Sequence, residues 1–306
     1  MNKLPAFYFP TNVVCVDDKE LDLMSYDLLF KDKYKSINFK TVKDSLAFFE
    51  NYASPLSKFE FISQINDFEH DDFSKQSAFQ LDISSIEQIY NDQSRYNEVG
   101  VVIADYHMEQ EISGLEMCKK IKNNKIKKFV ITVDKNGAIV LDALNSGVIS
   151  FFAYKTDPVD KVKFAVGDLM HNYFCEITAP ITRNLELEGV DVFSDPVFIK
   201  HFCQVIAQNN IVEYYLIDKN GSYLLISADQ QRYVLVVHTQ NSLNEFADLI
   251  NESVDGFDDI VKFKKIPFFG LWHNVSDVDL EEINQYLYSP YTLSGKHKYY
   301  LHLLSI

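Results

Sequence analysis

Gly100-Val-Val-Ile-Ala-Asp105 is an unbroken apolar run, rich in β-branched residues, that ends on a carboxylate. A continuous apolar run of this length is typical of a central strand in a parallel sheet that is covered on both faces. In an open α/β sheet, ligands bind beyond the carboxyl ends of such strands. We therefore expect the chemistry of this chain at Asp105.

The residues around this run repeat the same alternation of strand and helix. A second buried run, Asn12–Val16, ends on Asp17 and Asp18. Strands alternating with helices five times predict a doubly wound, five-stranded parallel sheet. The other strands are expected at 36–42, 129–132 and 149–153, and the helices at about 19–30, 44–49 (capped by Asp44), 114–121, 138–144 and 158–178.

The pattern loosens between Ser54 and Asn97, and we read this stretch as an insertion. The apolar residues from Leu56 to Ile65 suggest one helix, and Ser84, with a glutamate three residues later, is typical of the capping box that opens another. The acidic stretch 67–80 carries three phenylalanines, which predicts an ordered or half-ordered surface segment rather than a disordered linker.

Polar groups follow several of the predicted strands. They are Asp17 and Asp18 after the first, Asp105 after the third, Thr132 at the end of the fourth and Lys155 after the fifth. Clustered carboxylates need a counter-charge, and Mg²⁺ is the usual cation where water and phosphate complete its shell. A lysine and a hydroxyl opposite suit a phosphoryl group on the third carboxylate. The residues alone therefore predict a Mg²⁺-assisted acyl-phosphate site.

With these residues in this order, residues 10 to 175 resemble the receiver domain of bacterial two-component response regulators, whose fold is flavodoxin-like. The separation between the threonine and the lysine also fits that family. The matching stretches are Val13-Val-Cys-Val-Asp-Asp18, Val101-Val-Ile-Ala-Asp-Tyr-His-Met108 with Gly114, Val130-Ile-Thr132 and Phe151-Phe-Ala-Tyr-Lys155.

The resemblance implies a phosphoacceptor and its metal. Asp105 would take a phosphoryl group from a phosphohistidine on a sensor histidine kinase or a phosphotransfer protein. Asp18 and Asp105 would bind Mg²⁺ together with the backbone carbonyl of His107, and Asp17 would help through a water molecule. Lys155 would pair with the phosphoryl oxygens.

The resemblance also implies a two-state switch. The Thr132 hydroxyl would move to bond the phosphoryl group, and Phe152 would swing inward behind it, so that phosphorylation biases the equilibrium between two conformations. Taken alone, Phe152 is as well explained by ordinary core packing. Self-association through the fourth helix, fifth strand and fifth helix is a further expectation from the family.

Four features depart from the family pattern. The Ser54–Asn97 insertion lengthens the separation between the acidic pair and Asp105. The loop Met108–Gly114 lacks the usual proline and is one residue longer. Val133 is bulkier than the small residue that normally follows the threonine, so we expect it to restrict access of phosphodonors or water. Thr156 replaces the proline that usually follows the lysine. None of these changes removes a reacting group.

The composition limits the classes of partner. The 306 residues carry a formal net charge of −15, which disfavours sequence-independent binding to nucleic acid or to an anionic membrane. No apolar stretch approaches the length of a membrane-spanning helix, and no signal-peptide pattern opens the chain. The four scattered cysteines indicate a reducing compartment rather than disulfides. We expect a cytoplasmic protein that neither binds DNA nor inserts into a membrane.

The second half reads as an α+β domain with an antiparallel meander. We place a linker at 179–191 between a receiver domain at 8–178 and this output domain at 192–306. A helix opens at Ser194-Asp-Pro196, strands follow at 211–217, 223–227, 233–237 and 299–304, and helices are expected after Asn241 or Ser242 and over 280–288. We find no helix-turn-helix signature and no paired catalytic motif in it.

These observations predict a response regulator that accepts a phosphoryl group on Asp105 and signals to an unidentified downstream protein through contacts of its second half. We expect no enzymatic activity beyond gain and loss of that phosphoryl group. Two alternatives stay open: an output domain that is an enzyme or senses a small ligand, and a receiver that works without phosphate.

Overall fold

The computed structural model describes residues 2–59, 62–64, 79–81, 83–109, 112–133, 138–250, 257–271 and 280–306. The chain divides into two compact units, and each is made of segments that are separate in the sequence. Unit 1 comprises Met1–Tyr8, Phe59–Asn91 and Thr178–Ile306, and unit 2 comprises Phe9–Lys58 and Asp92–Ile177.

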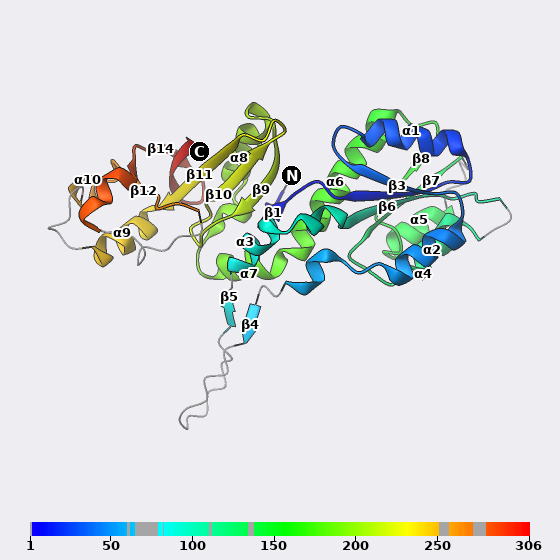
Figure 1. The fold of residues 1–306 in the computed structure, drawn as a ribbon, viewed down its shortest axis with the longest axis horizontal. Helices are drawn as coiled ribbons and strands as arrows, with labels where there is room; N and C mark the ends of the chain where they lie inside the picture. Colours follow the sequence, from blue (N-terminus) through cyan, green and yellow to red (C-terminus); the bar gives the residue numbers. More distant parts are fainter. Residues whose placement is uncertain are drawn as a thin grey trace, which may run out of the picture. The chain divides into compact units, whose positions relative to one another are not determined.

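Unit 2 is built on a parallel sheet with the strand order β3-β2-β6-β7-β8 (Figure 1). All its strand pairs are parallel, and every residue of the central strand β6 is buried, as its unbroken apolar run predicts. The predicted five-stranded α/β sheet is therefore confirmed. Its strands are β2 (Asn12–Val16), β3 (Lys35–Phe39), β6 (Val99–Asp105), β7 (Lys127–Thr132) and β8 (Phe151–Tyr154).

Helices cover both faces of this sheet. On one face, α2, α4 and α5 enclose a core that includes Val14, Val102 and Val130. Helices α1 and α6 cover the other face (Figure 1). The bounds are α1 (Glu20–Phe30), α2 (Val42–Asn51), α4 (Gly114–Lys120), α5 (Ala138–Asn145) and α6 (Val159–Ile177), with the short 3₁₀ helices η1 (Pro55–Lys58) and η2 (Gln93–Asn97).

The boundary between β3 and α2 differs from the prediction. The strand expected to reach Val42 ends at Phe39, and Val42 already belongs to α2. The helix is capped by Thr41, whose hydroxyl accepts the backbone N–H of Asp44, so Asp44 is not the capping residue. The threonine satisfies one of the helix's unpaired N–H groups and therefore fixes where the helix begins.

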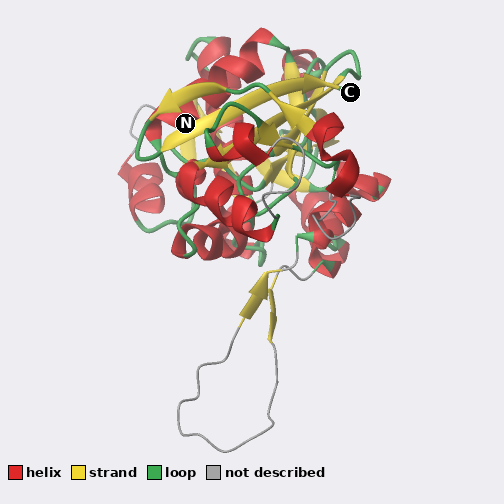
Figure 2. Cartoon of the chain, turned by 90° about the vertical axis from the view of Figure 1, so that its left-hand side faces the viewer, coloured by secondary structure: helices red, strands yellow, loops and turns green. Residues whose placement is uncertain are grey.

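The helix predicted from Leu56 to Ile65 was wrong. Among the described residues of this stretch only Pro55–Lys58 is helical, as η1. Ile62–Gln64 forms strand β4, which pairs antiparallel with β5 (Phe79–Leu81) as a two-stranded sheet (Figure 2). The helix predicted after Ser84 is confirmed as α3 (Ser84–Asn91). The surface segment predicted between the two strands lies outside the described residues.

Unit 1 is built on an antiparallel sheet with the strand order β1-β9-β10-β11-β15-β14. The predicted antiparallel meander is confirmed in β9, β10 and β11. The strands are β1 (Phe7–Tyr8), β9 (Ile211–Leu216), β10 (Tyr223–Ser227), β11 (Arg232–Thr239), β14 (Tyr291–Ser294) and β15 (Lys298–Ser305), and a separate pair is formed by β12 (Ile266–Pro267) and β13 (Leu287–Tyr288).

Several helices of unit 1 depart from the sequence prediction. The predicted linker contains α7 (Ala179–Leu187). Pro180 lies in its first turn, where a proline costs no hydrogen bond and so does not prevent the helix. The helix expected over 280–288 is instead η5 (Leu280–Tyr286) followed by β13. The remaining helices are α8 (Pro196–Gln208), α9 (Gln240–Leu249), α10 (Phe257–Val261) and η3 (Asp191–Phe193).

Two helices of unit 1 are capped by the side chain of the residue that precedes them. Asp195 caps α8, with Pro196 in the first turn, as the sequence predicts. Thr239 rather than Asn241 or Ser242 caps α9, and Ser242 completes a reciprocal capping box with it. In the part of the chain that the structure describes, no helix is long and apolar enough to cross a lipid bilayer.

Candidate functional site

The sheet of unit 2 brings the predicted site residues to one edge. Val16 is in register with Ala104, Asp105 with Ile131, and Thr132 with Tyr154. The residues that follow these parallel strands therefore meet at their shared carboxyl end, where open α/β sheets bind ligands. Asp17 and Asp18, Asp105, Thr132 and Lys155 all lie at this edge.

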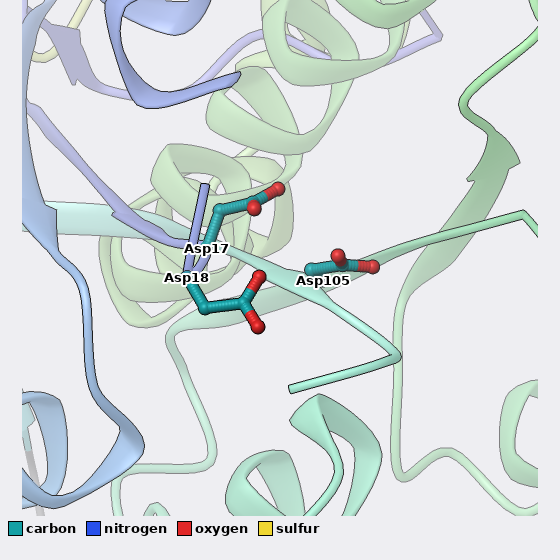
Figure 3. A group of neighbouring side chains, drawn as sticks. All are labelled: Asp17, Asp18 and Asp105. Atoms are coloured by element: carbon teal, nitrogen blue, oxygen red, sulfur yellow. The ribbon is translucent and has the colours of Figure 1, made fainter. Parts of the chain in front are cut away.

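Three carboxylates converge here. One oxygen from each of Asp17, Asp18 and Asp105 lies within 4.8 Å of the others, and Figure 3 shows Asp17 and Asp18 on the chain leaving β2 with Asp105 beside them at the end of β6. Asp17 and Asp105 are almost fully buried. Such a cluster carries a high density of negative charge in a site with little water, so it needs cations.

Lys155 supplies one cation. Its Nζ donates to Asp17 Oδ2 at 2.9 Å, to Asp105 Oδ2 at 2.8 Å and to Asp22 Oδ2 at 2.6 Å. Burial alone would lower the pKa of Lys155, but these hydrogen bonds to Asp105, Asp22 and Asp17 outweigh it and raise that pKa above its ordinary value. Lys155 therefore stays charged at neutral pH.

Backbone groups hold the carboxylates in place. The N–H of Lys19 donates to Asp17 at 3.0 Å, that of His107 to Asp105 at 3.3 Å, and that of Glu109 to Asp18 at 2.8 Å. Desolvation raises the pKa of Asp17, although its bonds from Lys155 and from the Lys19 N–H oppose that rise. Burial thus makes the charged form of Asp17 costly unless more positive charge is present.

Asp18 shows where a further cation fits. Its Oδ2 accepts the Glu109 N–H, but its Oδ1 is buried and has no hydrogen-bond partner among the described residues. A buried carboxylate oxygen without a donor is costly. Together with Asp17 and Asp105, it offers the hard oxygen ligands that Mg²⁺ prefers. The residues present therefore fit a divalent cation.

The two predicted switch residues, Thr132 and Phe152, lie on the neighbouring strands β7 and β8. Thr132 is buried at the end of β7, and its carbonyl accepts the Lys155 N–H at 2.8 Å. Phe152, on β8, is partly buried and packs against the core on the α2–α4–α5 face. That position satisfies the core-packing interpretation of Phe152, and its movement stays a prediction.

Sequence reasoning missed Asp22. It lies in the first turn of α1, four residues after Asp18, and makes the shortest of the three contacts to Lys155. Asp18 precedes the helix, whose N-cap is Lys19, so helical spacing does not link the two residues; the available signal was only an acid in the first turn next to the acidic pair. An acidic residue in the first turn of a helix is common because it stabilises the helix dipole, so its presence does not by itself indicate a functional site.

Two of the four departures from the family pattern, the loop after Met108 and Val133, lie on residues that follow β6 and β7. Glu109 is exposed and its backbone holds Asp18, whereas the next two residues, Gln110 and Glu111, are not described. Val133 is 57% exposed beside the buried Thr132. The predicted effect of Val133 on the access of phosphodonors or water stays a prediction.

Comparison with solved structures shows the fold of the whole chain. A response regulator from Legionella pneumophila, LqsR, superposes with a TM-score of 0.76 at 22% sequence identity, covering 99% of this chain and 89% of that one. The predicted resemblance to a response regulator is thus confirmed at the level of the fold.

Isolated receiver domains also align, but more weakly. A CheY-like receiver from Methanospirillum hungatei aligns over 55% of this chain and 98% of its own length, at 14% identity and a TM-score of 0.37. A receiver of a putative Luxo repressor from Vibrio parahaemolyticus covers 55% of this chain and 95% of its own, at 16% identity and a TM-score of 0.35. No protein-family model and no curated protein matches the sequence.

Proposed function

We propose that this chain, which shares the fold of a response regulator along its length, is a phosphorylation-controlled switch with Asp105 as its phosphoacceptor. The donor is a phosphohistidine on a sensor histidine kinase or a phosphotransfer protein. The signal leaves through protein contacts of unit 1 to a downstream partner. The support for this chemistry is the group of carboxylates around Asp105 and its contact with Lys155.

The observation that carries the proposal is the position of Asp105. Its carboxylate ends the central strand, lies 2.8 Å from the Lys155 ammonium and lies within 4.8 Å of the Asp17 and Asp18 carboxylates. A carboxylate oxygen attacks phosphorus, an acyl phosphate forms, and the bond to the donor imidazole breaks with the imidazole taking up a proton. Lys155 pairs with the phosphoryl oxygens and offsets their developing charge.

Asp18 and Asp105 would hold Mg²⁺, with the His107 carbonyl and, through water, Asp17. When bound, the ion would neutralise the carboxylates and the phosphoryl oxygens. The unpartnered buried Oδ1 of Asp18 supports this assignment among the described residues. The Thr132 hydroxyl would bond the phosphoryl group, and Phe152 would swing inward behind it.

Self-association would use α5, β8 and α6. The exposed apolar residues of the two helices, Ile139 and Phe164 among them, suit such a contact.

The test is covalent labelling of the whole chain. With acetyl phosphate and Mg²⁺, we expect wild type to gain one phosphoryl group by intact-mass spectrometry, and Asp105→Asn to gain none, because the amide oxygen is a poor nucleophile. Chelating Mg²⁺ should abolish labelling. Asp44→Asn, an exposed change in the first turn of α2 outside the acidic cluster, is the matched control and should label like wild type.

Two results would contradict the proposal. Labelling that persists in Asp105→Asn would move the phosphoacceptor elsewhere. A wild-type chain that neither labels with acetyl phosphate nor responds to beryllofluoride with Mg²⁺ would favour a receiver that works without phosphate.

A further inference from the structure

Lys155 has one carboxylate partner that the proposed phosphorylation chemistry does not use. Of its three acceptors, Asp17 and Asp105 belong to the buried cluster, with side chains 0% and 3% exposed. The third, Asp22, is 35% exposed and comes from α1 rather than from a strand end. Its 2.6 Å contact is nevertheless the shortest of the three.

Asp22 also borders open space that the other two carboxylates do not reach. A hollow of about 220 Å³ is lined by Asp22, Tyr26 and Leu29 of α1, by Tyr154 at the end of β8, and by Lys155 and Asp157 after it. Lys155 therefore stands between two environments, the buried carboxylate cluster and this hollow. Its long flexible side chain allows the ammonium to favour either one.

The charges make these two positions compete. A divalent cation held by Asp18 and Asp105 repels the Lys155 ammonium, which then needs a carboxylate outside the metal's ligands. Asp22 provides one. A phosphoryl group on Asp105 has the opposite effect, because its oxygens attract the ammonium away from Asp22. The negative charge of Asp22 also opposes the gathering of phosphoryl charge nearby.

We propose that Asp22 is a positioning residue that competes with the phosphoryl group for Lys155. It holds the ammonium while the metal occupies the cluster, and it releases the ammonium when Asp105 carries phosphate. Asp22 thus favours metal binding and disfavours the phosphorylated form. This inference rests on the proposed function.

An ordinary structural role makes a different prediction. An acidic residue in the first turn stabilises a helix through its dipole, and Glu20 occupies the same turn of α1. Glu20 pairs with Lys40 at the surface instead of with Lys155. Glu20→Gln therefore removes the same charge from the same turn without touching Lys155, which makes it the matched control for Asp22→Asn.

The experiment measures two affinities on the full chain by calorimetry. For Asp22→Asn, we expect Mg²⁺ to bind roughly three- to tenfold more weakly and beryllofluoride, at saturating Mg²⁺, to bind more tightly by a similar factor. Asp22→Glu, which keeps the charge, should restore both towards wild type. Glu20→Gln should leave both unchanged. A damaged fold would weaken both ligands, so the opposite signs identify the competition.

The possible failures are distinguishable. If Asp22→Asn behaves like Glu20→Gln while wild type binds both ligands, the inference is overturned and the proposed function stands. If Asp22→Asn weakens both ligands and Asp22→Glu does not rescue them, the competition is likewise overturned. If wild type binds neither Mg²⁺ nor beryllofluoride, the proposed function falls and the role of Asp22 falls with it.

Discussion

His238 is a buried histidine in the sheet of unit 1 whose two ring nitrogens are both engaged. Nε2 lies 3.0 Å from the carbonyl oxygen of Pro267, and Nδ1 lies 3.2 Å from the Ser242 hydroxyl. Since the carbonyl can only accept, Nε2 carries the proton of the neutral ring. Burial lowers the pKa of His238 despite the opposing charge of Asp218 and the bond to Pro267, so the ring is neutral in the folded chain.

This shift predicts a loss of stability in mild acid. The folded pKa lies below the unfolded value of about 6.5, so the stabilisation is complete above that pH and is lost as the pH falls below it. Between pH 7 and pH 5 we expect the free energy of unfolding to drop, with about 2 kcal/mol as the most that one histidine can contribute over the pH units below its unfolded pKa. Urea titrations followed by the fluorescence of the single tryptophan, Trp272, measure it.

A substitution isolates the histidine responsible. His238→Gln keeps a donor and an acceptor but cannot titrate, so its stability should vary less between pH 7 and pH 5 than that of wild type. His302→Gln, on the neighbouring strand β15, is the control and should keep the wild-type pH dependence. Equal pH dependence in all three chains would assign the acid sensitivity to other groups.

At the scale of single residues, the sequence predicted those whose position follows from a strand end. Asp17 and Asp18 follow a buried strand, Asp105 ends another and Lys155 follows the partly buried β8, and parallel pairing brings these strand ends together. Asp22 was not predictable in this way, because its partner Lys155 lies 133 positions away and an acid in a first turn has an ordinary local explanation.

At the scale of elements, Gly114 determines how closely α4 approaches the end of β6. A Cβ atom at this position would lie 2.1 Å from the Asp105 carbonyl oxygen and 2.9 Å from Ala104 Cβ. Neither neighbour can move without displacing the central strand. Glycine is thus required by space, and the Gly114 N–H bond to the Tyr106 carbonyl, at 3.2 Å, fixes the same approach.

We therefore expect Gly114→Ala to damage both the fold and the site. The free energy of unfolding should fall by about 1–3 kcal/mol through overpacking, and Mg²⁺ affinity should fall because the backbone of Asp105 shifts. Thermal melting and calorimetry measure the two effects. Gly167→Ala, on α6, is the control: its Cβ would meet nothing within 4 Å, so helix propensity predicts an unchanged or slightly higher stability. Equal behaviour of both variants would refute the steric argument.

Elements with strong local signals were predicted, and those decided by distant pairing were not. The buried runs of β2 and β6 and the Asp195–Pro196 start of α8 are local signals. By contrast, Ile62–Gln64 is a strand only because it pairs with Phe79–Leu81, and its apolar residues fit a helix equally well. A short apolar run does not by itself distinguish the two.

At the scale of the whole chain, the polypeptide passes between the two units four times, after residues 8, 58, 91 and 177. The presence of one α/β fold and one α+β fold was predictable from periodicity. The assignment of Met1–Tyr8 and Phe59–Asn91 to unit 1 was not, because β1 pairs with β9 more than two hundred residues later. The predicted bounds, a receiver domain at 8–178, a linker at 179–191 and an output domain at 192–306, stay a prediction.

Glu98 is fully buried in unit 2. Its carboxylate binds segments next to three of these crossings, those after residues 58, 91 and 177. Its carboxylate accepts from the Tyr52 hydroxyl at 2.9 Å, the Ser54 hydroxyl at 2.6 Å, the Leu56 N–H at 3.3 Å and the Tyr173 hydroxyl at 2.6 Å. Burial and the Glu98 charge raise the pKa values of Tyr52 and Tyr173, which keeps both as donors. One carboxylate thus ties together the end of α2, the start of η1 and the end of α6.

Glu98→Gln should loosen all of these segments at once. The amide has the same shape, but its NH₂ group faces donors that the carboxylate satisfied, so we expect unit 2 to lose roughly 2–3 kcal/mol of stability. Amide hydrogen exchange should quicken at Leu56 and at Val99, whose N–H donates to the Tyr52 hydroxyl. Glu176→Gln, which breaks a surface pair with Lys127, should cost far less. If the two variants have the same melting temperature and the same amide exchange rates, Glu98 does not hold these segments together.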